Sequence, residues 1–378
     1  MTGAVPTDIR LPADLLPRDG RFGSGPSKIR PEAVAALSSL GATLLGTSHR
    51  QAPVRRLVGR LRRGLSELLA LPEGYRVVLG NGGSTMFWDV ATFGLIEHRS
   101  QHVTFGEFSA KFAAAVASAP HLERPDVIAV APGTTSHCTA AQGVDLYALT
   151  HNETSTGVVM GLRRPEGTDA GALVAVDATS AAGGVRFDPN QVDVYYFAPQ
   201  KGFASDGGLW VAALSPAALE RVARIKSSGR WMPASLDLSI AVEESARDQT
   251  YNTPALVTLV LMAEQVDWML AGGGLEWAAG RCDRSAAILY GWAESSAYAT
   301  PFVAKPDDRS PVVGTIDLDG SVDALTVSGV LRANGIVDTE SYRKLGRNQV
   351  RIGMFPAVEP ADVEALTACI DFVVCALS

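Results

Sequence analysis

Short apolar runs alternate with amphipathic segments along most of the chain. Runs rich in β-branched and aromatic residues predict buried strands at 75–79, 102–104, 127–130, 144–149, 173–177, 192–197 and 209–213. Apolar residues at helical spacing predict helices at 31–40, 53–69, 216–225 and 255–270, with two more after residues 85 and 108. This alternation predicts an α/β fold with a mainly parallel central sheet. The stretch 227–249 follows neither period and is expected to be irregular.

A second unit is expected after the glycine run at 272–274. An amphipathic helix at 275–292 follows, and then strand, helix, strand and helix patterns at 312–318, 324–333, 349–354 and 360–377. A chain of 378 residues exceeds the about 250–300 residues that one core usually serves. We therefore expect a large domain at 31–270 and a small C-terminal α/β domain at 271–378, grouped with an N-terminal arm at 1–30.

Composition excludes several classes of protein. The net charge of -7 argues against a general binder of nucleic acid or of anionic membranes, so any anion site must be local. The four cysteines contain no CxxC pair and no zinc spacing, which predicts reduced thiols and no metal site. The N-terminal sequence does not resemble a signal peptide, and the longest apolar stretch, at 255–263, is too short to span a bilayer. These features favour a cytoplasmic globular protein.

A glycine-rich loop lies between the strand at 75–79 and the next helix. Its sequence, Gly80-Asn81-Gly82-Gly83-Ser84-Thr85, places free N–H groups and the positive end of a helix dipole where an anion can bind. The loop matches neither GxxxxGK[ST] nor GxGxxG, which disfavours nucleoside triphosphates and dinucleotides. A glycine turn needed only for packing is the alternative.

Ionisable and aromatic residues follow other predicted strands. Lys201 follows the strand at 192–197, and partial desolvation there would lower its pKa and make it a nucleophile. Alone, Lys201 is more simply a surface lysine, Asp177 a turn cap and Phe108 a core residue. Together with the 82–85 loop they fit one ligand, because pyridoxal 5′-phosphate has an anionic group, a flat ring, a basic ring nitrogen and a carbonyl.

The chain resembles the phosphoserine aminotransferases among the class V, fold-type I pyridoxal-phosphate enzymes, in their actinobacterial form. The resemblance covers almost the whole chain. Its most specific motifs are Gly23-Ser24-Gly25-Pro26, Ser48-His49-Arg50, Asn152-Glu153-Thr154, Val176-Asp177, Gln200-Lys201 and Tyr251-Asn252-Thr253-Pro254.

The resemblance implies a role for each cofactor-binding residue. Lys201 holds the cofactor as a Schiff base and later moves the substrate proton, while Asp177 keeps the ring nitrogen protonated. Phe108 stacks on the ring, and Thr154 bonds its phenolic oxygen. The phosphate is held by Ser84, Thr85 and Gln200, and by Asn252 and Thr253 of a second subunit, which implies a homodimer with shared active sites.

The resemblance also implies a substrate site. Arg351 binds the α-carboxylate, and Ser24 contributes to substrate binding. His49 and Arg50 of the neighbouring subunit read the substrate phosphate or the side-chain carboxylate of glutamate. Some relatives carry a further His-Arg pair before the carboxylate-binding arginine. This chain has Tyr342-Arg343-Lys344 and Arg347 instead, and we take Arg343 as the residue that completes the phosphate site.

The expected reaction is reversible transamination between glutamate and 3-phosphohydroxypyruvate, which forms O-phospho-L-serine for serine biosynthesis. The motifs do not decide whether the enzyme also acts on phosphohydroxythreonine in pyridoxine biosynthesis. The alternatives are an alanine–glyoxylate type aminotransferase, disfavoured by His49-Arg50, and a cysteine desulfurase, for which no cysteine is suitably placed. A nucleotide-binding oxidoreductase lacks its glycine fingerprint, and a non-catalytic protein that retains the fold has no use for Lys201 and Asp177 together.

Overall fold

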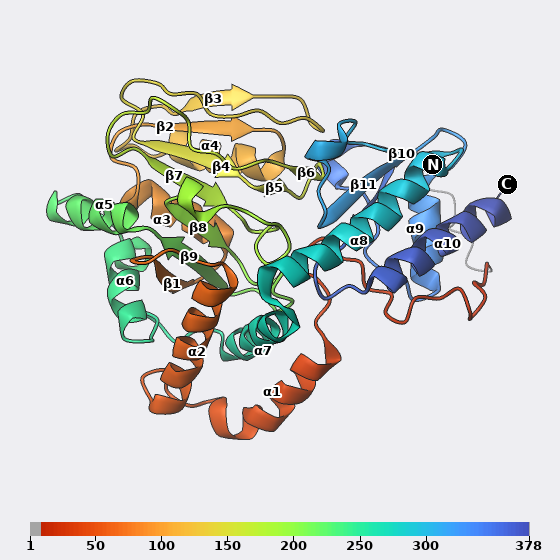
Figure 1. The fold of residues 1–378 in the computed structure, drawn as a ribbon, viewed down its shortest axis with the longest axis horizontal. Helices are drawn as coiled ribbons and strands as arrows, with labels where there is room; N and C mark the ends of the chain where they lie inside the picture. Colours follow the sequence, from red (N-terminus) through yellow and green to blue (C-terminus); the bar gives the residue numbers. More distant parts are fainter. Residues whose placement is uncertain (1–8, 378) are drawn as a thin grey trace.

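The computed structural model describes residues 9–377 and is built around one large mixed sheet (Figure 1). Within that range the sheet has seven strands in the order β1-β9-β8-β7-β4-β2-β3. They are β1 (Arg76–Asn81), β2 (Ser100–Thr104), β3 (Asp126–Ala129), β4 (Leu146–Thr150), β7 (Leu173–Asp177), β8 (Val194–Phe197) and β9 (Leu209–Leu214). Strand β9 is antiparallel to its neighbours β1 and β8, and the other adjacent strands pair in parallel. The predicted α/β class with a mainly parallel sheet is confirmed.

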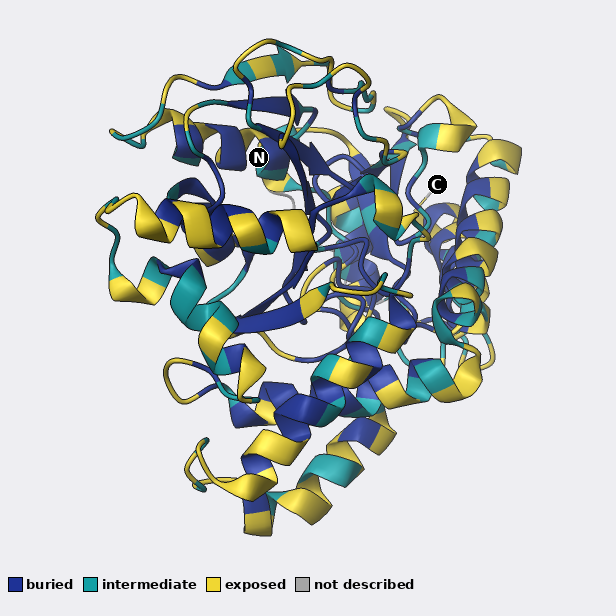
Figure 2. Cartoon of the chain, turned by 60° about the vertical axis from the view of Figure 1, so that its left-hand side comes forward, coloured by how far each residue is buried: buried dark blue, intermediate teal, exposed yellow. Residues whose placement is uncertain are grey.

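Helices cover both faces of this sheet. They are α1 (Pro31–Leu44), α2 (Ala52–Leu68), α3 (Ser84–Gly94), α4 (Glu107–Ala117), α5 (Pro216–Ser227), α6 (Leu238–Ala246) and α7 (Leu256–Gly272). Alternate strand residues enter different cores: Tyr195 and Phe197 pack with α2 and α7, whereas Tyr196 packs with α3, α4 and α5. Figure 2 shows most strands of the sheet buried and the outer helix faces exposed, whereas the edge strand β3 alternates intermediate and exposed residues. Burial on both faces explains the continuous apolar runs in the sequence.

The expectation of an irregular stretch at 227–249 is wrong. It contains a 3-10 turn at Ala234–Leu236 and the helix α6, whose start is capped by the Asp237 side chain accepting from the Ser239 N–H. Only Leu238 and Ser245 of α6 are buried, so the helix has little apolar periodicity. The short strands β5 (Asn152–Glu153), β6 (Val158–Val159) and β10 (Ala299–Pro301) were also not predicted.

A second apolar core lies in the C-terminal part of the chain. It is formed by α8 (Gly274–Ser295), α9 (Ala324–Ala333), α10 (Pro360–Leu377) and the antiparallel strands β10, β11 (Val313–Leu318) and β12 (Gln349–Gly353). Leu11 and Phe22 of the N-terminal arm are buried in this core. The grouping of the arm with the small domain and the bounds 31–270 and 271–378 stay predictions, and residues 1–8 of the arm lie outside the described part.

Residues 9–377 contain no single helix that is long and apolar enough to cross a membrane. Helices α7 and α8 reach the required length and composition only as a pair, and that pair is bent by 91°.

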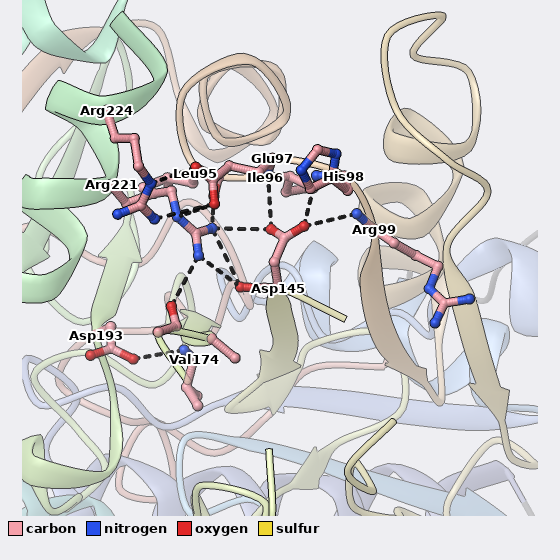
Figure 3. A network of polar contacts seen from close by, with 12 residues as sticks. Leu95, Ile96, Glu97, His98, Arg99, Asp145, Val174, Asp193, Arg221 and Arg224 are labelled. Carbon is pink, nitrogen blue, oxygen red and sulfur yellow. Dashed lines mark hydrogen bonds and ion pairs between the residues drawn. The ribbon is translucent and has the colours of Figure 1, made fainter. Parts of the chain in front are cut away.

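A buried arginine joins α5 to the amino ends of the central strands, opposite the edge where the candidate residues lie (Figure 3). The Arg221 side chain is 2% exposed and donates to the carbonyls of Leu95 at 2.7 Å and Gly171 at 3.0 Å. It also forms ion pairs with Asp145 at 3.0 Å and Glu97 at 3.1 Å. Arg221 therefore holds several chain segments together at one buried point.

Replacing Arg221 with methionine should lower the free energy of unfolding by about 3–5 kcal/mol, because it removes the buried cation that pairs with Asp145 and Glu97 and leaves the carbonyls of Leu95 and Gly171 without its donors. The matched control is Arg224→Met, since Arg224 pairs with the same Glu97 but is 54% exposed. The control should cost less than about 1 kcal/mol. Urea denaturation followed by circular dichroism measures both, and equal losses would contradict a special role for Arg221.

Candidate active site

A cavity of about 280 Å³ opens at the carboxyl ends of β4, β7 and β8. This is where open α/β sheets place their ligands. The cavity brings together seven of the residues predicted from the sequence: Ser84, Thr85, Phe108, Thr154, Asp177, Gln200 and Lys201.

Lys201 is buried at this cavity and is 8% exposed. Its Nζ donates to Thr154 Oγ1 at 3.1 Å. Gly25 lies so close that a Cβ there would be 2.6 Å from Lys201 Cε. Burial and, secondarily, the positive charge of Arg351 lower the pKa of Lys201 to about 8, although the carboxylates of Asp177 and Glu153 oppose the shift. The amine is thus neutral, and nucleophilic, over much of the weakly alkaline range.

Acetylation of the cofactor-free protein by acetic anhydride should show this pKa directly. The labelling rate of Lys201 should rise about tenfold per pH unit and level off near pH 8, because only the neutral amine reacts. Lys226, whose pKa is raised by the hydrogen bond that it donates to Asp237, serves as the internal control, and its rate should keep rising well above pH 8. Mass spectrometry of the two peptides provides the rates, and parallel profiles would contradict the lowered pKa.

Asp177 ends β7 and is 5% exposed. Its Oδ1 accepts from the Thr179 N–H at 2.9 Å and from Thr179 Oγ1 at 2.5 Å, and its Oδ2 accepts from Trp88 Nε1 at 3.0 Å. These three bonds fix the carboxylate at the wall of the cavity that Lys201 also lines. A basic ring nitrogen bound opposite Asp177 would keep its proton.

The phosphate cradle predicted after β1 is the start of α3. Gly83 precedes the helix, so the first N–H groups of α3 point out of its end beside the Ser84 and Thr85 hydroxyls. Gly82 has φ +112°, a backbone conformation that favours glycine. On the other side of the cavity Gln200 Oε1 is buried without a hydrogen-bond partner within residues 9–377. The N–H groups and hydroxyls suit a phosphate, and the unpaired amide oxygen of Gln200 suits a hydrogen-bond donor.

Phe108 and Arg351 lie on the side of Lys201. The Phe108 ring centroid is 5.6 Å from Lys201 Nζ. Arg351 donates through Nη1 to the Thr154 carbonyl at 3.3 Å, and its guanidinium lies 5.3 Å from the Tyr342 ring centroid. Among the described residues, Arg351 Nε and the buried Ser24 Oγ have no hydrogen-bond partner. Arg351 can therefore bind a carboxylate, because most of its donors are unused.

Seven of the predicted residues do not line this cavity: Ser24, His49, Arg50, Asn252, Thr253, Arg343 and Arg351. Four of them form a group beside the glycine loop, where His49 Nδ1 lies 3.1 Å from Thr253 Oγ1 and Asn81 Nδ2 donates to the Thr253 carbonyl at 2.9 Å. This group consists of His49, Arg50, Asn252 and Thr253. Arg50 donates to Gln249 Oε1 at 3.2 Å in the same group. Their predicted contribution to the active site of a second subunit stays a prediction.

Arg343 lies exposed on a short turn, Arg343–Leu345, and has no ion pair in the described part of the chain. The other two candidates nearby are engaged: Lys344 Nζ contacts Glu107 at 2.5 Å, and Arg347 contacts Asp317 at 2.5 Å. Arg343 is thus the free cation of this turn.

Sequence reasoning did not give roles to six residues that line the cavity: Gly25, Trp88, Thr150, Asn152, Thr179 and Ser180. A signal for Trp88 exists, because it lies one helical turn after Ser84 and so faces the same side as the cradle. Thr179 and Ser180 directly follow Asp177, and the Asn152 amide donates to Ser180 Oγ at 2.9 Å.

A buried lysine, a fixed carboxylate and an anion cradle at the carboxyl edge of this sheet define a pyridoxal-phosphate enzyme of fold type I. The comparison with known families agrees, since residues 89–366 match the family described as "Aminotransferase class-V". The chain belongs to the class-V aminotransferase family, and the cofactor of this family is pyridoxal 5′-phosphate.

Named relatives are similar to this chain over nearly the full length of both proteins. A putative phosphoserine aminotransferase of Mycobacterium leprae is 61% identical over 99% of both chains. A phosphoserine aminotransferase of a Nocardioides species is 62% identical over 97% of this chain and 98% of its own. The crystal structure of a phosphoserine aminotransferase from Cytophaga hutchinsonii, 23% identical, has the same fold, with a TM-score of 0.86 over 93% of this chain and 99% of its own.

Proposed function

We propose that this protein is a phosphoserine aminotransferase, which interconverts 3-phosphohydroxypyruvate and glutamate with O-phospho-L-serine and 2-oxoglutarate in L-serine biosynthesis. The observation that carries the proposal is a buried Lys201 that shares one cavity with Asp177 and lies beside the largely unpaired guanidinium of Arg351. The names of relatives at 61% and 62% identity support the choice of substrate.

Bound pyridoxal 5′-phosphate supplies a carbonyl for the amino group and an electron sink for the carbanion at the substrate Cα. Lys201 Nζ would move the proton between the substrate Cα and the carbon that carries the cofactor carbonyl, which its lowered pKa allows near neutral pH. Asp177 would accept a hydrogen bond from the ring nitrogen and so keep a proton there. Arg351 orients the substrate through its α-carboxylate, and Phe108 covers one face of the site.

Further residues would hold the phosphate groups. Ser84, Thr85 and Gln200 would bind the phosphate of the cofactor, and Thr154 its phenolic oxygen. Ser24, whose buried hydroxyl has no partner in the described part of the chain, would contact the substrate.

A homodimer would complete the site. His49 and Arg50 would bind the substrate phosphate, and Asn252 and Thr253 the cofactor phosphate, across the interface. Support comes from their clustering beside the glycine loop without lining the cavity of their own chain. Sedimentation of the protein as a monomer at assay concentration would refute this part of the proposal.

The predicted location of the enzyme is the cytoplasm. Support comes from its acidic charge and from Cys138, Cys282, Cys369 and Cys375, all of which are free thiols. Cell fractionation that finds the protein outside the cytoplasm would overturn this location.

The test of the function is a comparison of acceptors with glutamate as the amino donor. Purified protein loaded with pyridoxal 5′-phosphate should convert 3-phosphohydroxypyruvate with a kcat/KM at least about a hundredfold above that for glyoxylate, because unpaired cations would otherwise remain at the phosphate site. Equal or greater activity on glyoxylate would favour the alanine–glyoxylate type instead. Phosphohydroxythreonine in the same assay, run in the reverse direction, decides whether the enzyme also acts there.

Arg343 should matter for the phosphorylated substrate alone. Arg343→Ala should raise the KM for 3-phosphohydroxypyruvate about tenfold, because a charge-assisted hydrogen bond to phosphate is lost, and should leave the KM for glutamate nearly unchanged. Arg347→Ala is the matched control, since Arg347 is already paired with Asp317. Steady-state kinetics with both substrates measures the difference, and equal effects of the two variants would refute the choice of Arg343.

A further inference from the structure

Glu153 is a buried carboxylate that none of the mechanistic steps above uses. It lies in β5, is 0% exposed, and forms no ion pair with any described residue. Five donated hydrogen bonds replace a counter-cation. Oε2 accepts from the N–H groups of Phe108 at 3.1 Å and Ser109 at 2.9 Å and from Ser109 Oγ at 3.0 Å, and Oε1 accepts from the Ser155 N–H at 3.2 Å and from Ser155 Oγ at 2.7 Å.

Three of these five donors, on Phe108 and Ser109, belong to the first turn of α4. A helix leaves its first N–H groups unpaired, and the residue before α4 is Gly106, which has no side chain to cap them. The segment 153–155 supplies the missing cap from a distant part of the chain, because Ser155 Oγ also accepts from the Glu107 N–H at 3.0 Å. A Cβ at position 106 would lie 2.3 Å from Glu153 Cγ, so the absence of a side chain there lets the carboxylate approach.

The same segment also reaches the active site. Phe108, whose N–H is held by Glu153, places its ring 5.6 Å from Lys201 Nζ. Thr154, the next residue after Glu153, accepts from Lys201 at 3.1 Å and offers its carbonyl to Arg351 at 3.3 Å. The segment 153–155 therefore fixes the distance between the Phe108 ring and Lys201.

We infer that Glu153 is a positioning residue: from β5 it caps the start of α4 and so sets the Phe108 ring over the cofactor. This inference rests on the pyridoxal-phosphate site of the proposed function. A glutamate that only stabilised the helix would affect folding without acting through Phe108, and the two cases can be separated by coupling.

The test is a double-mutant cycle on cofactor affinity, measured by equilibrium dialysis with pyridoxal 5′-phosphate and by the visible circular dichroism of the bound cofactor. Glu153→Gln keeps the shape but turns an amide NH2 toward N–H donors, and should weaken binding about tenfold. In a Phe108→Ala background the same change should weaken binding less than about twofold, because the ring to be positioned is gone. Glu276→Gln, at an exposed glutamate on α8, is the control and should change nothing.

Each outcome decides between the possibilities. Unchanged affinity and dichroism in Glu153→Gln, or equal losses in both backgrounds, would overturn the positioning role while leaving the proposed function intact. Wild-type protein that binds no pyridoxal 5′-phosphate would overturn both. If Glu153→Gln fails to fold, Ser155→Ala is the second variant. It removes the hydrogen bonds of Ser155 Oγ to Glu153 Oε1 and to the Glu107 N–H, and it keeps the bonds to Glu153 Oε2. Its effect on cofactor affinity should be smaller and should depend on Phe108 in the same way.

Discussion

Lys201→Ala should lower kcat for 3-phosphohydroxypyruvate and glutamate by at least about a thousandfold. The substrate proton at Cα needs a base at a fixed place, and among the described residues Lys201 is the only lysine that lines the cavity. Water would have to replace it in a space that Gly25 and Thr154 closely border. Single-turnover kinetics together with the absorbance of the bound cofactor measures the loss.

The same experiment separates chemistry from folding. Wild-type protein should be yellow and bleach when glutamate is added, whereas Lys201→Ala should not respond. Lys305→Ala, at an exposed lysine paired with Asp308, is the control and should keep wild-type activity. Glutamate-dependent bleaching in Lys201→Ala would show that another residue carries the reaction.

Asp177→Asn should lower kcat by at least about a hundredfold, because the site loses the negative charge that keeps the ring nitrogen protonated. The hydrogen bonds add to the effect. Both oxygens of Asp177 accept from the protein, one from Trp88 and one from Thr179, so either orientation of an asparagine amide sets an NH2 group against an N–H donor. Steady-state kinetics and the pH titration of the cofactor absorbance measure the two consequences.

The exposed Asp307→Asn is the charge-matched control and should leave kcat within about twofold. A normal kcat in Asp177→Asn would mean that the ring nitrogen needs no proton, and it would contradict the role given to this carboxylate. If Asp177→Asn weakens cofactor binding but the cofactor-bound fraction keeps its kcat, Asp177 contributes only to cofactor affinity.

Most of the central sheet could be predicted because its strands are buried on both faces. Leu173–Asp177 and Leu209–Leu214 are continuous apolar runs for this reason. Helix α6 escaped prediction because a mostly unburied helix has no apolar stripe, although Asp237 before it is a typical N-cap. Strands of two or three residues, such as β5, are too short to show a period.

For the site, the sequence predicted which residues end the strands but not what holds them. Lys201 and Asp177 were predicted from their places after strands, and they line one cavity. The spacing from Ser84 places Trp88 on the side of the cradle, but nothing local in the sequence shows where its indole N–H points. The role of Glu153 depends on a contact with α4, which is 44 residues away at Ser109, and spacing along the chain cannot predict such a contact.

Gly25 has a consequence for engineering of this protein. It lies against the Lys201 side chain, while Phe22, three residues earlier, is anchored in the C-terminal core. The C-terminal core therefore sets the position of the segment 22–25, and this segment limits the space around the Lys201 side chain. Truncation of the chain into this segment, or a short rigid tag fused next to it, would therefore change the space available to the Lys201 amine.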